Sequence, residues 1–117
     1  MKIRIKGNSL RFRLTKSDIA ALGNGEVIKE QTEFLSKVLV YQIHPFRGET
    51  IAADFDGENL ILQVPQDMLN ELANTDKVGF SGVSGVVSVL IEKDFTCLDN
   101  VEEDQSDNFP NPLLRKN

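Results

Sequence analysis

The first fourteen residues, MKIRIKGNSLRFRL, constrain the fold of this chain more than any other segment. Apolar and cationic residues alternate with period two on both sides of a Gly7-Asn8 pair, which is the pattern of two antiparallel strands joined by a tight turn. If the turn consists of these two residues, the pairing of the strand residues follows by counting outward from it. The pattern therefore predicts a hairpin over residues 2–14. The side chains expected to be buried on its apolar face are Ile3, Ile5, Leu10 and Phe12.

The opposite face of the same hairpin is wholly cationic. Like charges that face one another destabilise a strand pair, so this face needs water, acids of its own chain or an anionic partner. The acids that could neutralise it are Glu92 and Asp94 on the last strand, or Glu26, Glu30 and Glu33 on the third. Guanidinium and ammonium groups could otherwise bind a phosphate, a polyphosphate or an acidic peptide. The candidate anion-binding residues are Lys2, Arg4, Lys6, Arg11 and Arg13.

The remainder of the chain reads as short strands and two short helices. Thr15 and Asp18 have the spacing of a capping box, which predicts a helix before Gly23 or Gly25. The second helix is predicted over residues 65–75, with Met68, Leu69 and Leu72 facing inward, and the glycines at 79, 82 and 85 suggest a turn or bulges. Further strands are expected at residues 26–34, 38–44, 50–55, 59–64, 77–82 and 86–95.

A weak internal repeat is visible. LRFRLTKSDIAAL resembles LILQVPQDMLNEL, and with one gap Asp18 falls on Asp67 and Ile19 on Met68. Both stretches lie in the order strand, helix, strand. The similarity is a hint of duplication.

Eight strands and two helices define an α+β protein built mainly on antiparallel sheet, and eight antiparallel strands can close into a barrel. The strand order resembles that of the triphosphate tunnel (CYTH) barrels. That family carries an alternating Glu-x-Glu-x-Lys strand near its N-terminus, whereas this chain has KIRIK and RFR there. The resemblance therefore implies a barrel topology and does not carry over the family's metal chemistry.

The two ends of the chain carry a second resemblance. MKIRIKGNSLRFRL at the start and LIEKDFTCL with FPNP near the end are similar to a family of small uncharacterised bacterial proteins. That resemblance implies a bacterial, cytoplasmic, single-domain protein and no particular reaction.

Composition narrows the classes of function. The chain has 117 residues, a net charge of −5 and one cysteine, so it fits one domain without an internal disulfide. A negative net charge argues against general binding to nucleic acid, and no segment resembles a signal peptide or a bilayer-spanning helix. We expect a cytoplasmic protein with one domain over residues 1–98 and an acidic loop or tail over residues 99–117, which Phe109 pins back. Such a tail could shield the basic hairpin.

No enzyme motif stands out. The acidic segment DNVEEDQSD lacks the glycine and the spaced ligands of an EF-hand loop, and Cys97 and His44 have no third ligand for zinc. A nucleophilic Cys–His pair would require these two residues to meet in space. The weak candidates for a metal are Glu92 and Asp94, together with Glu30.

The leading prediction is a non-enzymatic protein, without a cofactor, that binds an anion or an acidic partner through the N-terminal hairpin. One alternative is a divergent phosphohydrolase that uses Mg²⁺ or Mn²⁺ inside a barrel. Another is a structural subunit whose strands complete the sheet of a partner. A tunnel enzyme would place carboxylates beside the cations inside a closed cavity, whereas a binding protein can display its cations on an open surface.

Overall fold

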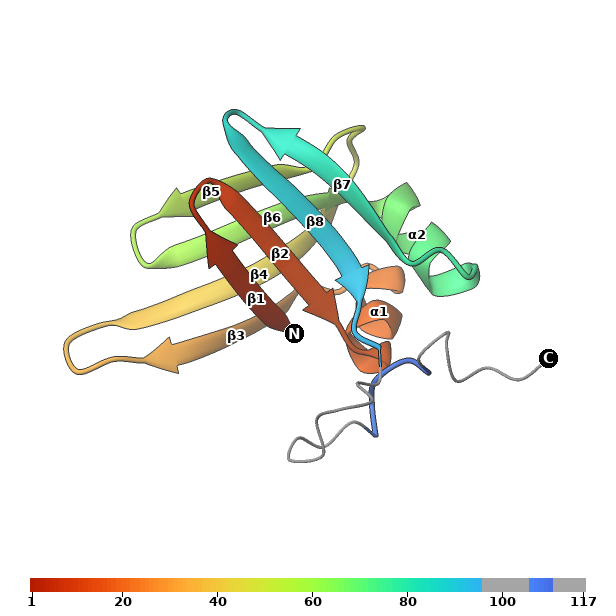
Figure 1. The fold of residues 1–117 in the computed structure, drawn as a ribbon, viewed down its shortest axis with the longest axis horizontal. Helices are drawn as coiled ribbons and strands as arrows, with labels where there is room; N and C mark the ends of the chain where they lie inside the picture. Colours follow the sequence, from red (N-terminus) through yellow and green to blue (C-terminus); the bar gives the residue numbers. More distant parts are fainter. Residues whose placement is uncertain (96–105, 111–117) are drawn as a thin grey trace.

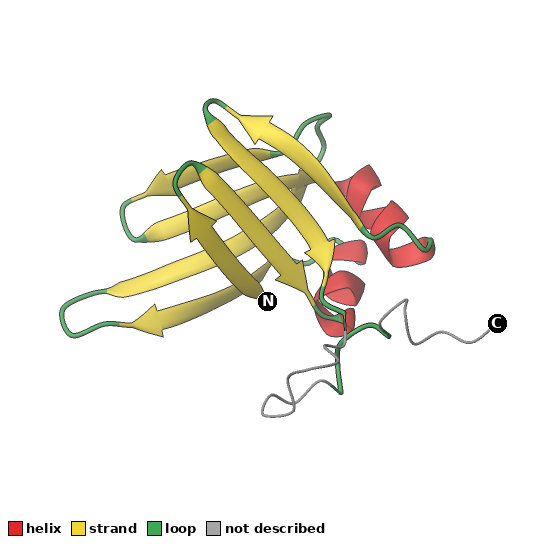
Figure 2. Ribbon diagram, viewed as in Figure 1, coloured by secondary structure: helices red, strands yellow, loops and turns green. Residues whose placement is uncertain are grey.

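The computed structural model describes residues 1–95 and 106–110. These residues form two four-stranded sheets, with two helices side by side at one end (Figures 1 and 2). Sheet A has the order β1 (Lys2–Lys6), β2 (Ser9–Leu14), β8 (Val87–Lys93) and β7 (Gly79–Ser84). Sheet B has the order β3 (Ile28–Glu33), β4 (Val38–Phe46), β6 (Asn59–Pro65) and β5 (Ala52–Asp56). The helices are α1 (Lys16–Gly23) and α2 (Gln66–Asn74).

The N-terminal hairpin has the predicted register. Ile5 pairs with Leu10, Ile3 pairs with Phe12, and Gly7 has a φ of +54°, which glycine adopts without strain. Leu10 and Phe12 are buried as predicted, and Ile3 is partly buried against the core. The prediction for Ile5 is wrong, because its side chain is 60% exposed. β1 is an edge strand of sheet A, and Ile5 lies near the turn.

The first helix begins at the predicted capping box. The Thr15 hydroxyl accepts a hydrogen bond from the Asp18 amide at 3.3 Å, and the Asp18 carboxylate accepts one from the Thr15 amide at 3.0 Å. α2 begins after Pro65 without a side-chain cap. Two residues of each helix are buried, Ile19 and Leu22 in α1 and Leu69 and Leu72 in α2.

The sheets are mixed, so the prediction of a mainly antiparallel sheet is wrong at its two central pairings. β2 pairs with β8 in parallel, and β4 pairs with β6 in parallel. Parallel neighbours require long connections, and here each central pair joins strands from opposite halves of the chain. The closed barrel is also wrong, because the described strands form two separate sheets. The sheets are linked along one side, where the Ser84 hydroxyl accepts a hydrogen bond from the Ala53 amide at 3.0 Å.

The two halves of the chain repeat one arrangement of two strands, a helix and two strands. Lys2 pairs with Arg13 in the first half, and Ala52 pairs with Gln63 in the second. Each residue of the second pair lies fifty positions after its counterpart in the first pair. The same shift relates the buried Ile19 to Leu69 and Leu22 to Leu72. The hint of duplication is therefore supported by the topology, and the gap that placed Ile19 on Met68 is unnecessary. The first hairpin of each half pairs with the second hairpin of the other half.

The core fills the space between the sheets and continues beneath the helices. Phe12 in β2 and Leu62 in β6 are both fully buried, and they occupy equivalent positions in the two halves. The buried apolar residues are Leu10, Phe12, Leu14, Ile19, Leu22, Ile43, Ile51, Leu60, Leu62, Val64, Leu69, Leu72, Val89 and Ile91.

Residues 106–110 pack against the end of β8. The Phe109 amide donates to the Asp94 carbonyl at 2.8 Å, and the Phe109 ring lies 6.0 Å from that of Phe95. The ammonium of the buried Lys93 lies 5.0 Å from the centre of the Phe109 ring and donates to the Thr75 carbonyl. This segment confirms that Phe109 holds the chain against the body. Residues 96–105 and 111–117 of the predicted tail lie outside the described residues.

One ionisable contact in this segment gives a prediction about pH. Hydrogen bonds from the side chains of Thr15 and Ser17 hold the pKa of the Asp107 carboxyl below its ordinary value. A carboxyl group whose pKa falls on folding stabilises the native state above its unfolded pKa, and that contribution is lost as the pH falls through the folded pKa. We expect the difference in free energy of unfolding between the natural chain and Asp107→Asn to shrink as the pH falls below about 4. Urea unfolding at several pH values measures it, and a constant difference would contradict the assignment.

Candidate functional site

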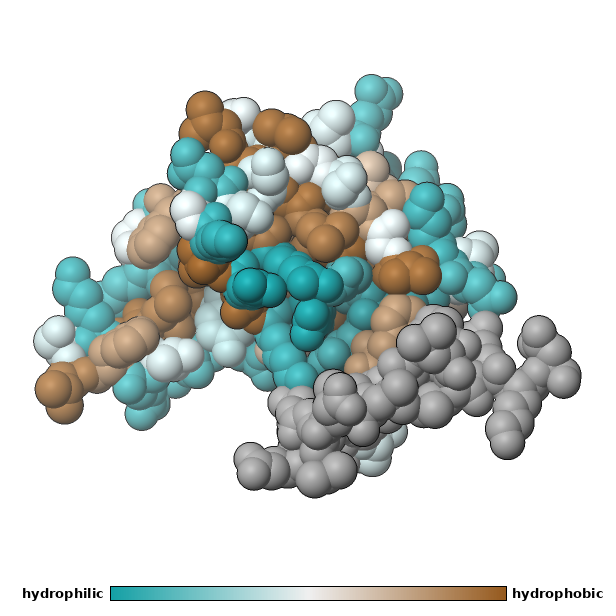
Figure 3. Space-filling view, viewed as in Figure 1, coloured by the Kyte–Doolittle hydropathy of each residue, from teal (hydrophilic) through white to brown (hydrophobic). Residues whose placement is uncertain are grey.

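The five predicted cations lie on the face of sheet A that points away from the core. We call Lys2, Arg4, Lys6, Arg11 and Arg13 the basic face. Arg4 pairs with Arg11 and Lys2 pairs with Arg13 across the hairpin, while Phe12 points into the core from the opposite side. Figure 3 shows hydrophilic side chains gathered at the centre of this view, over β1 and β2. The hairpin thus brings the predicted anion-binding residues together on one exposed surface.

A single carboxylate of the last strand fixes the two arginines. Arg13 and Glu92 are neighbours in the parallel register of β2 and β8. Oε1 of Glu92 accepts from Nε of Arg11 at 2.6 Å and from Nε of Arg13 at 3.2 Å. The same oxygen lies 2.6 Å from Nη2 of Arg11. Glu92 is mostly buried, so these charge-assisted bonds hold both guanidinium groups in place.

Among the described residues, the other guanidinium donors of Arg11 and Arg13 have no hydrogen-bond partner. The contacts with Glu92 use Nε and Nη2 of Arg11 and only Nε of Arg13. Within residues 1–95 and 106–110, neither Arg4 nor Lys6 forms an ion pair. The basic face therefore keeps an excess of positive charge after its contact with Glu92.

Asp94 forms the second acidic contact of the basic face. Its Oδ2 atom is buried and lies 3.2 Å from Nζ of Lys2, although the pair does not have hydrogen-bond geometry. The backbone of Asp94 bonds to Leu14 through its amide and to Phe109 through its carbonyl. Asp94 thus links the basic face to residues 106–110, which pack against the end of β8.

Glu30 and Glu33 in β3, and Glu26 in the loop before it, do not neutralise the basic face. Oε2 of Glu30 lies 3.6 Å from the Met1 ammonium, which also lies 3.0 Å from Oδ2 of Asp18. Glu33 accepts a hydrogen bond from Gln31. Glu26 is exposed in the loop before β3. Of the acids that the sequence offered, Glu92 and Asp94 are the two that reach the cations.

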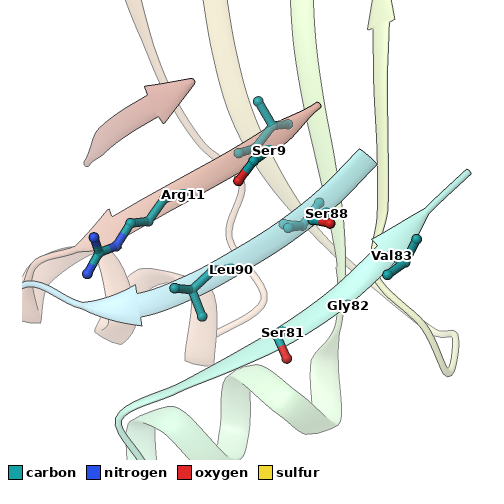
Figure 4. Close-up of a pocket in the computed structure, with 9 residues that line it drawn as sticks. Ser9, Arg11, Ser81, Gly82, Val83, Ser88 and Leu90 are labelled. Carbon is teal, nitrogen blue, oxygen red and sulfur yellow. The ribbon is translucent and has the colours of Figure 1, made fainter. Parts of the chain in front are cut away.

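Two shallow hollows lie on sheet A and share Arg11. The smaller one, of about 230 Å³, is lined by Ile3 and four cations, Lys2, Arg4, Arg11 and Arg13. The larger one, of about 420 Å³, extends over β2, β8 and β7 (Figure 4). In Figure 4 the guanidinium of Arg11 points away from Ser9 and Ser88. The arginine thus separates a cationic hollow from one lined by small and apolar groups.

The larger hollow was not foreseen from the sequence. Its lining includes three serines and two leucines, which lie on β2, β7 and β8. The available signal was the alternation of VVSVLIEK, which places Ser88, Leu90 and Glu92 on one face of a strand. The missing information was the pairing of β8 with β2, which brings this face beside Arg11. The residues that the sequence reasoning missed are Ser9, Ser81, Ser88 and Leu90.

The candidates for metal and nucleophilic chemistry do not assemble in the part of the chain described. Among these residues, no three histidine, cysteine or acidic side chains lie together so that they could hold a metal ion. Glu92, Asp94 and Glu30 are each paired with a cation. His44 lies in β4, with Nε2 at 2.7 Å from Oε1 of Gln42. Cys97 lies outside the described residues.

The fold and its surface define a small two-sheet protein with two helices and an exposed basic face. The chain belongs to a family of unknown function, DUF7009, whose model matches residues 1–113. No curated protein and no solved structure matches the chain. Among the described residues, no helix combines the length and the apolar character needed to cross a membrane.

Proposed function

We propose that this protein binds an anion through the basic face, and that the ligand presents phosphoryl or carboxylate groups. The observation that carries the proposal is the smaller hollow, in which four cationic side chains surround about 230 Å³. Glu92 is the acid that contacts the two arginines of this hollow. A hollow of this size suits one phosphoryl or carboxylate group, since sites for larger molecules occupy roughly 300–1,000 Å³.

Glu92 affects anion binding in two opposing ways. It holds Arg11 and Arg13 in fixed positions, which lowers the entropy lost when a ligand binds. It also places a negative charge beside the ligand, which weakens binding by Coulomb repulsion. The adjoining larger hollow extends the surface, so a ligand longer than one phosphoryl group could continue over Ser9 and Ser88.

Replacing Glu92 by glutamine separates its effect on the positions of the arginines from the effect of its negative charge. In Glu92→Gln the amide oxygen still accepts a hydrogen bond while the negative charge is lost, so we expect tripolyphosphate to bind about tenfold more tightly. Isothermal titration calorimetry at low salt measures the affinity. Glu33→Gln is the matched control, because it removes the same charge from an exposed position on β3 and should change the affinity much less.

The same titration distinguishes the two sources of anionic groups. Tripolyphosphate and a poly-glutamate peptide are titrated separately, and the tighter ligand identifies the class. Raising the salt concentration should weaken either complex, because exposed charges are screened over about 10 Å at 0.1 M. The proposal fails if neither ligand binds at low salt, or if Glu92→Gln and Glu33→Gln have equal effects.

A further inference from the structure

Exposed apolar side chains gather at the end of the molecule opposite the helices. The turns of all four hairpins lie away from α1 and α2 (Figure 1). Among the described residues, two exposed large apolar side chains, Val27 and Val78, lie outside the hairpins and flank the helices in the sequence. Figure 3 shows hydrophobic side chains at the ends of β3–β4 and β7–β8. Those that lie on the hairpins are Ile5, Phe34, Leu35, Phe55, Val83 and Val86.

An apolar groove of about 430 Å³ opens at this end between the two sheets. It is lined by residues that occupy equivalent positions in the two halves of the chain. Ile5 and Phe55 are fifty positions apart, as are Leu10 and Leu60. Asp54 also lines the groove, Asp56 ends β5 beside it, and Glu58 lies in the β5–β6 turn. The groove is therefore apolar within and acidic on one side.

The β3–β4 hairpin carries an apolar tip at the same end. The Phe34 amide donates to the Lys37 carbonyl at 2.8 Å, which closes the turn. The Leu35 side chain is fully exposed, and that of Phe34 is 62% exposed. Burying such side chains is favourable by about 1.5–3 kcal/mol each, so a fixed turn that displays both of them is suited to a contact with another surface. The exposed Lys37 lies directly beside this tip.

We propose that two copies of this chain associate through this end, each placing its Phe34–Leu35 tip in the apolar groove of the other. The tip and the groove lie on one surface, so a two-fold axis lets each copy supply both parts. Charge favours the same contact, because Lys37 beside the tip meets Asp54 on the acidic side of the groove. This surface lies at the strand ends and leaves most of the basic face open.

Sedimentation equilibrium of the full chain at increasing protein concentration tests the association. The natural chain should form a dimer, and Leu35→Glu should weaken it at least tenfold, because a carboxylate would enter an apolar groove beside Asp54. Val78→Glu is the matched control, since it introduces the same charge at an exposed apolar position near the helices. Circular dichroism should show both variants folded. A natural chain that remains monomeric overturns the proposal, as does a dimer that Leu35→Glu leaves intact.

A charge exchange tests the contact itself. Lys37→Glu and Asp54→Lys should each weaken the dimer, since each places like charges together in both halves of the interface. An equimolar mixture of the two variants should restore association, because every contact again joins opposite charges. A mixture as weak as the separate variants would show that Lys37 and Asp54 do not meet. If a monomeric chain instead binds an apolar dye in the groove, the groove belongs to a small ligand and the proposal is wrong.

Discussion

Phe12→Ala is expected to lower the free energy of unfolding by about 3–5 kcal/mol. The ring is fully buried between the sheets, next to Ile91 in the register of β2 and β8. Its removal loses the transfer energy of the ring and leaves a cavity that the neighbouring strands cannot fill completely. Urea unfolding followed by circular dichroism measures the change. For a domain of this size, such a loss removes a large share of the total stability.

Ile5→Ala is the control within the same hairpin. The sequence pattern predicts that Ile5 and Phe12 are both buried, whereas Ile5 is 60% exposed in the structure. Its truncation should cost no more than about 1 kcal/mol. Leu62→Ala, at the position equivalent to Phe12 in the second half, should cost about 2–5 kcal/mol. Equal costs for Ile5→Ala and Phe12→Ala would contradict the described packing.

The Arg11→Ala, Arg13→Ala double variant is expected to weaken anion binding by about a hundredfold. Hydrogen bonds to charged groups contribute about 1.5–3 kcal/mol each, and the variant removes at least one such bond from each arginine. The structure places both guanidinium groups at the smaller hollow, where Glu92 orients them. Titration with tripolyphosphate at low salt measures the loss.

Two controls accompany this variant. Arg47→Ala removes an exposed guanidinium at the end of β4 and should have little effect. Removing both arginines also leaves the mostly buried Glu92 without these partners, which destabilises the fold. The double variant is therefore also made with Glu92→Gln, so that a loss of binding in a stable protein can be attributed to the arginines. An affinity equal to that of the Glu92→Gln single variant would show that the basic face is an ordinary solvated surface.

Local features of the fold could be predicted from the sequence. The N-terminal hairpin was predicted with its register, because the turn residues and the alternation of Ile3, Ile5, Leu10 and Phe12 lie within one short segment. The capping box of α1 was predicted for the same reason. The burial of Ile5 was not predicted correctly, since alternation shows which face a side chain takes and not how far the opposite sheet extends to cover it.

Long-range features could not be predicted in the same way. Leu14 pairs with Lys93, and the sequence near either residue contains nothing that specifies the other. The parallel pairings and the two separate sheets depend on such contacts. The candidate site combines local and long-range features in the same way. Its five cations lie in one short segment and could be predicted from it. The sequence could not show that Glu92 and Asp94 contact these cations, while Glu26 and Glu33 do not, because that depends on which strand pairs with β2. The apolar tip was missed because Phe34 was assigned to a strand.

The exchange of hairpins between the two halves has a consequence for synthesis. Sheet A combines β1 and β2, the first two described strands in chain order, with β7 and β8, the last two. While the ribosome makes the intervening residues, the apolar side of the first hairpin has no partner strand beside Leu10, Phe12 and Leu14. Contacts at such sequence separation are slow to form, and exposed strand edges favour aggregation until they do. Completion of this protein's fold therefore waits until β8 has left the ribosome.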